Sequence, residues 1–128
     1  MRRIRVAAGK VTATALLGDT EAARAFWDAL PVSGTGMRWG DEIYFRIPVE
    51  LGEEAARPVV DRGDIAYWAP GSALCIFFGP TPVSAPGEIR PASPVTVIGR
   101  VEGDPGVFTG VSDGTLVVIE RLKPGTTT

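Results

Sequence analysis

The chain lacks the side chain that most enzymes use for proton transfer at neutral pH, because none of its 128 residues is histidine. This absence excludes Ser–His and Cys–His nucleophile pairs and zinc sites that need histidine ligands. Two adjacent carboxylate pairs remain, Asp41–Glu42 and Glu53–Glu54. Adjacent strand residues point to opposite faces, so neither pair predicts an acid–base couple, and we expect all four carboxylates to be solvated.

The single cysteine, Cys75, is the other candidate for chemistry. It lies in the apolar run Ala-Leu-Cys-Ile-Phe-Phe, which favours a buried and unreactive thiol over a nucleophile. One cysteine cannot form an internal disulfide, which fits a reducing compartment. We therefore expect a cytoplasmic protein that needs no cofactor and no metal.

Aromatic residues gather in GDIAYWAPGSALCIFFGPTP, residues 63–82, and are the candidates for binding. Pro70–Gly71 predicts a type II turn that places Tyr67 and Trp68 at the end of a strand, on opposite faces. Phe77 and Phe78 are strand neighbours, so one fills the core and the other is free to line a pocket. Tyr44 shares a strand face with Glu42 and Arg46, and that face is either a binding surface or the solvent side of the strand.

The elements that would position these residues are mostly short strands. Alternating residues predict a hairpin that turns at Gly9–Lys10, and apolar spacing predicts one helix from Asp19 or Thr20 to Leu30. Glycines at Gly34-Thr-Gly36 and Gly103-Asp-Pro-Gly106 predict turns. Further strands are expected at 42–47, 65–68, 73–78, 95–101 and 115–122. Many short strands with one helix indicate a barrel or sandwich, and a closed barrel is favoured because it leaves no strand edge exposed.

Composition is that of a soluble domain, with 45% hydrophobic and 22% charged residues. We expect one domain over residues 1–122 and a flexible tail at 123–128. A net charge of −2 offers no basic face, so nucleic acid is not expected as a partner. The basic N-terminus lacks an unbroken apolar stretch, so we expect neither a signal peptide nor a membrane segment.

Three blocks of sequence resemble the cyclophilin-like family of short bacterial and archaeal proteins. They are WGDEIYFRIP (39–48), GDIAYWAPGSALCIFFGPTPVS (63–84) and IRPASPVTVIGRV (89–101). The resemblance implies a mostly β fold, namely a closed antiparallel eight-stranded β-barrel with one or two capping helices.

The resemblance also marks Arg46 as the position of the catalytic arginine of cyclophilins. However, Arg46 lies two residues before Pro48 rather than three, and a shift of one residue would turn its side chain to the other face. The pocket glutamine of cyclophilins is replaced by Cys75 or Ile76.

Three functions remain open on these grounds. The first is a binding domain for a small molecule or an extended peptide, with a site drawn from Tyr44, Tyr67, Trp68, Cys75, Phe77 and Phe78. The second is a peptidyl-prolyl isomerase, a reaction that needs no nucleophile and that the fixed donors of Arg46 could assist. The third is a structural subunit, for example one that forms a homodimer.

Overall fold

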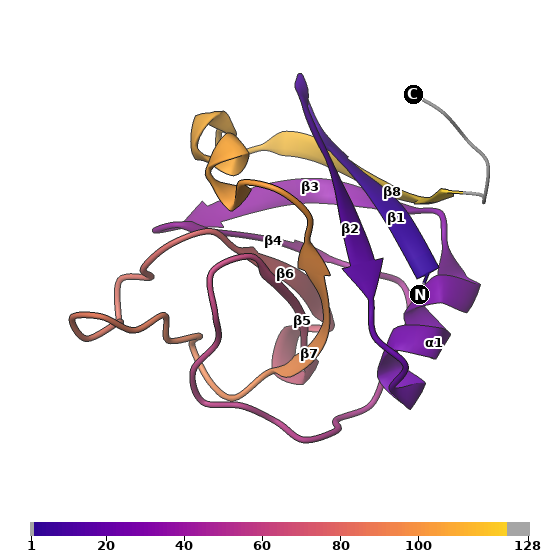
Figure 1. Ribbon diagram of the computed structural model, residues 1–128, viewed down its shortest axis with the longest axis horizontal. Coiled ribbons are helices and arrows are strands. Elements are labelled where there is room, and N and C mark those ends of the chain that lie inside the picture. Colours follow the sequence, from indigo (N-terminus) through magenta and orange to yellow (C-terminus); the bar gives the residue numbers. More distant parts are fainter. Residues whose placement is uncertain (1, 123–128) are drawn as a thin grey trace.

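The computed structural model describes residues 2–122, which form a closed antiparallel barrel of eight strands (Figure 1). The strands follow one another around the barrel in the order β1-β2-β7-β5-β6-β4-β3-β8. This architecture confirms the expected fold class, whereas the expected tail at 123–128 lies outside the described residues. The strands are β1 (Arg2–Ala8), β2 (Val11–Leu17), β3 (Val32–Trp39), β4 (Glu42–Arg46), β5 (Asp64–Trp68), β6 (Ala73–Phe77), β7 (Thr96–Val101) and β8 (Thr115–Leu122).

Three helical segments complete the fold: α1 (Glu21–Ala29) and the short 3-10 helices η1 (Ala69–Gly71) and η2 (Pro105–Gly110). The predicted helix is confirmed, and its first turn is capped by Thr20, whose hydroxyl accepts a hydrogen bond from the amide of Ala23 at 3.1 Å. None of the helices between residues 2 and 122 is long and apolar enough to cross a membrane.

Strand β3 contains the largest error of the sequence prediction, because Gly34 and Gly36 lie inside a strand and not in a turn. A Cβ atom at Gly34 would lie 2.9 Å from Cδ2 of Phe45, and one at Gly36 would lie 2.8 Å from Cγ2 of Val117. These glycines therefore make room for large core side chains. Glycine is unfavourable in strands, so its sequence signal was that of a turn.

The connection after β5 also differs from the prediction. It is the 3-10 turn η1, and the residue in the left-handed region is Ser72, with φ of 47°, rather than Gly71. The predicted type II turn is therefore wrong. Gly71 is needed for another reason, since a Cβ there would lie 2.5 Å from Cζ3 of Trp68. The indole ring of Trp68 packs directly against the glycine backbone.

Strands β5 and β6 are buried on both of their faces. The covered outward face provides the floor of a site outside the barrel. Their inward side chains join the barrel core. Their outward side chains lie beneath the two long loops at 47–63 and 79–95, which are joined to each other by bridges from Arg57 to Val95 and from Val60 to Ile89. We call the resulting apolar group the outer cluster; its buried members are Val60, Ala66, Cys75, Phe77, Ile89 and Val95.

Candidate ligand pocket

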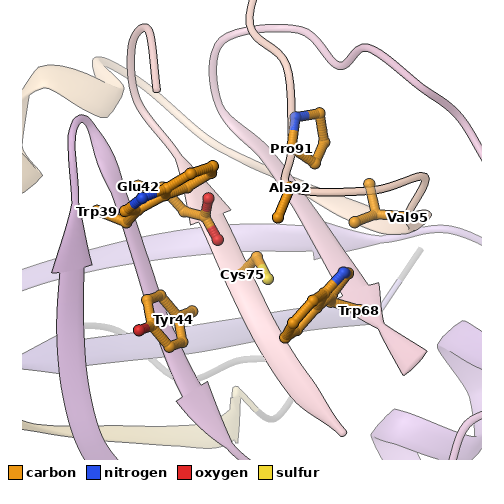
Figure 2. A pocket seen from close by; sticks show the side chains of 8 residues that line it. All are labelled: Trp39, Glu42, Tyr44, Trp68, Cys75, Pro91, Ala92 and Val95. Atoms are coloured by element: carbon orange, nitrogen blue, oxygen red, sulfur yellow. The ribbon is translucent and has the colours of Figure 1, made fainter. Parts of the chain in front are cut away.

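A pocket of about 160 Å³ opens on the outer face of the barrel, beside the outer cluster (Figure 2). Strands β3, β4, β5 and β6 contribute to it, together with the loop before β7. Strand register explains the gathering: Trp39 lies opposite Glu42, and Tyr44 lies opposite Cys75, so these four side chains share one face of the sheet. This outer pocket is lined by Trp39, Glu42, Tyr44, Trp68, Cys75, Pro91, Ala92 and Val95.

Three half-buried aromatic side chains form the walls of the outer pocket: Trp39, Tyr44 and Trp68. Trp68 is held in place from two sides. Its Nε1 donates a hydrogen bond of 2.7 Å to the hydroxyl of Ser93, and its ring packs on Gly71. An indole fixed in this way keeps its orientation when the pocket is empty, so the wall that it forms is preorganised.

Glu42 is the polar group of the outer pocket, and its burial corrects the expectation that it is solvated. The residue is only 5% exposed. Within residues 2–122, its Oε1 is the only buried side-chain nitrogen or oxygen atom without a hydrogen-bond partner. Its neighbour Asp41 points elsewhere and pairs with Arg38 at 3.1 Å. The two adjacent carboxylates therefore diverge as predicted, but one of them points into an apolar pocket.

Burial raises the pKa of Glu42 to about 7, and the nearby Cys75 thiol only partly offsets this effect. Figure 2 shows the Glu42 carboxylate pointing toward Cys75, below Trp39. Cys75 forms the floor of the pocket and is buried as expected. Its own pKa is raised well above the ordinary value by burial and by the neighbouring carboxylate, so its thiol stays protonated.

The other residues proposed from the sequence lie outside the outer pocket. Tyr67 and Phe78 are in the barrel core, where the ring of Phe78 lies 6.2 Å from that of Phe108. Phe77 is on the outer side but is completely covered in the outer cluster. Arg46 lies two residues after Tyr44 on the outward face of β4. It is exposed and does not line the pocket.

The structure thus brings together three of the predicted binding residues, Tyr44, Trp68 and Cys75, and adds five others. Trp39 was missed because β3 was not recognised as a strand. Glu42 was noticed on the same face as Tyr44, but nothing in the sequence showed that a loop covers that face. No cluster of three acidic or cysteine side chains that could hold a metal ion occurs within residues 2–122.

The fold and the site define a class of protein, a small closed barrel with a pocket on its outer wall. The profile of the cyclophilin-like family matches residues 2–120, and the chain belongs to this family. The recognition made from the three sequence blocks is therefore confirmed. No curated protein matches the chain.

Solved structures that are similar to this chain over most of its length include the following two. The solution structure of the hypothetical protein AF2241 from Archaeoglobus fulgidus has 45% sequence identity and a TM-score of 0.77, over 94% of this chain and 95% of that chain. The structure of McbB in complex with tryptophan has 17% identity and a TM-score of 0.70, over 98% of this chain and 46% of that chain. At this low identity, the likeness to McbB shows a shared fold.

Proposed function

We propose that this domain is a binding module for a small molecule, which inserts a compact apolar group into the outer pocket. The observation that carries the proposal is the pocket itself, about 160 Å³ in volume and bordered by Trp39, Tyr44 and Trp68. A cavity of about 150 Å³ in another protein accommodates benzene. The size therefore suits one ring or one branched alkyl group.

The arrangement of Trp68 supports a binding role over a purely structural one. A tryptophan that only filled space would be expected to close over the apolar floor at Cys75. Instead, Ser93 and Gly71 hold the indole at the side of the pocket, so that Cys75, although itself buried, remains part of the lining. A preorganised aromatic wall reduces the entropy lost on binding.

The complex of McbB with tryptophan gives weaker support, because that protein shares the fold with only 17% identity. It shows that a barrel of this type occurs in a protein that binds a small aromatic molecule. Indole and tryptophan are therefore reasonable first probes, alongside aliphatic compounds of similar size.

The test uses the three tryptophans of the chain as internal reporters in a ¹H–¹⁵N spectrum. Millimolar indole, tryptophan, 3,3-dimethylbutanol or choline is titrated into the protein, and we expect at least one of them to shift the indole N–H signals of Trp39 and Trp68. The signal of Trp27, which lies on α1 near Arg2 and Arg121, should stay in place. The variant Ser93→Ala should weaken binding, since Trp68 then loses its hydrogen bond. The absence of any shift with every probe would overturn the proposal.

Prolyl isomerisation is a second candidate, favoured by the position of Arg46. This arginine is exposed on the outward face of β4, two residues beyond Tyr44. A peptide with its proline ring in the outer pocket could therefore reach the guanidinium with a neighbouring carbonyl or amide. A protease-coupled assay should then show activity that Arg46→Ala removes and that Arg24→Ala, at an exposed position on α1, leaves unchanged. Background rates in the unmodified protein would exclude this candidate.

A further inference from the structure

We propose that the outer pocket selects an organic cation, with the positive group of the ligand held between Trp39, Tyr44 and Trp68 and paired with the buried carboxylate of Glu42. The proposal rests on the proposed binding function and specifies the chemistry of the ligand. It predicts a quaternary or protonated aliphatic amine whose charge is surrounded by methyl or methylene groups.

The first argument is the missing partner of Glu42. The other buried carboxylate, Asp64, is 3% exposed and is well matched: it accepts a hydrogen bond from the amide of Asp61 at 2.9 Å and lies 3.8 Å from Arg57 and 3.9 Å from Arg100. Glu42 is similarly buried, but its Oε1 has no partner in the described part of the chain. A buried ionised group without a partner is costly. A protonated amine would supply both a hydrogen-bond donor and a compensating charge, and a quaternary ammonium group would supply the charge alone.

The second argument is the composition of the walls. The faces of tryptophan and tyrosine rings attract cations within about 6 Å. The same chain uses this attraction elsewhere, for Arg38 lies 4.8 Å from the ring of Phe78, and Arg121 lies 5.5 Å from that of Trp27. By contrast, no lysine or arginine among residues 2–122 lines the outer pocket. Three aromatic walls and a carboxylate without any internal cation form a cage of the kind that binds quaternary ammonium groups.

The third argument concerns pH. The titratable groups in the lining are Glu42 and Tyr44 from β4 and Cys75 from β6, while β3, β5 and the loop at 91–95 contribute no titratable side chain. Burial raises the pKa of Glu42 to about 7. A permanent cation favours the ionised carboxylate, so its binding should release a proton. The affinity for such a cation should therefore rise as the pH increases through 7.

The deciding experiment compares choline with 3,3-dimethylbutanol, which has the same shape but carbon in place of the charged nitrogen. Binding is followed through the indole N–H signals of Trp39 and Trp68 at pH 6 and pH 8. At pH 8 we expect choline to bind about tenfold more tightly than the alcohol, since cation–π contacts and the carboxylate act together. The preference should shrink at pH 6, and it should be lost in Glu42→Gln while Glu53→Gln, at an exposed position, retains it.

The outcomes separate this inference from the proposed function. If the alcohol binds as tightly as choline at pH 8, or if only indole binds, the cation proposal is overturned while the pocket remains a binding site. If no probe binds, both proposals fall. If Glu42→Gln does not fold, the pH dependence of the unmodified protein is an independent check. A choline affinity that is equal at pH 6 and pH 8 would contradict the role of Glu42.

Discussion

Glu42 is a buried carboxylate in an otherwise largely apolar pocket, and its burial has a cost in stability. Its neighbours in the outer pocket are aromatic or aliphatic apart from the Cys75 thiol, and its Oε1 has no hydrogen-bond partner within residues 2–122. Folding therefore favours the carboxylic acid over the carboxylate and raises the pKa of Glu42 to about 7. A group of this kind is often found where a protein binds or transforms a ligand.

We predict that Glu42→Gln stabilises the free protein at neutral and alkaline pH. The folded-state pKa of about 7 lies above the ordinary value of 4.5, so the unmodified protein loses stability as the pH rises from about 4.5 to about 7. The loss should reach about 3 kcal/mol, because each unit of pKa corresponds to about 1.4 kcal/mol. Urea unfolding at pH 4 to 8 should show the gap between variant and unmodified protein opening across that range.

The control for this prediction is Glu53→Gln, which removes a carboxylate at an exposed position of the 47–63 loop. Its stability should follow that of the unmodified protein at every pH. If the gap between Glu42→Gln and the unmodified protein were constant from pH 4 to 8, the burial of an ionisable Glu42 would be contradicted.

At the scale of elements, strand β3 positions Trp39, and two glycines inside this strand allow it to pack closely on the core. Gly34 and Gly36 face the barrel core and allow Phe45 and Val117 to pack against the strand backbone. The outward residues of the same strand then meet β4, which places Trp39 opposite Glu42 and Met37 opposite Tyr44. The aromatic wall outside the barrel thus depends on close packing inside it.

Gly36→Ala should therefore destabilise the fold by about 1 to 3 kcal/mol, the usual effect of adding a methyl group to a full core. The new Cβ would lie 2.8 Å from Cγ2 of Val117 and 3.0 Å from the carbonyl oxygen of Thr115. Gly110→Ala is the matched control, since no heavy atom of the described chain lies within 4 Å of a Cβ there. Urea unfolding should show the control unchanged or slightly stabilised; equal effects of the two substitutions would refute the packing argument.

For the molecule as a whole, the barrel is closed at both ends by aromatic side chains from outside the sheet. Phe26 enters the core from α1, and Phe108 enters it from η2; both are completely buried. Figure 1 shows α1 and the orange coil of η2 at opposite ends of the strands. The interior is thus filled with side chains, and the ligand site that we propose is on the outer wall.

We predict that the two ends contribute independently to stability. Phe26→Leu and Phe108→Leu should each lower the free energy of unfolding by about 1 to 2 kcal/mol, because each leaves a partly filled space. Their effects should add to within about 0.5 kcal/mol in the double variant, since α1 and η2, which carry the two residues, lie at opposite ends of the strands. The measurement is a double-mutant cycle by urea unfolding, and a larger coupling would show that the core does not behave as two separate ends.

The sequence by itself determined several of the local elements and the family. The alternation of Ile4 and Val6, the turn at Gly9–Lys10 and the capped helix that begins after Thr20 are set by short-range sterics and hydrogen bonds, so they can be recognised in the chain. The three family blocks then implied the closed eight-stranded barrel, which the structure confirms.

Only the tertiary structure decided which side of each strand forms the pocket. Alternation of side chains along β5 and β6 shows that Tyr67 and Trp68 point to opposite faces, and so do Phe77 and Phe78. Because both faces are mostly apolar, the sequence does not show which residue of each pair is inside the barrel. The choice depends on loops 47–63 and 79–95, distant in sequence, that cover the outer face. Glu42 is buried beside one of these loops, at Pro91, Ala92 and Val95. The local sequence of β4 does not show this burial, because it depends on a loop that is distant in the chain.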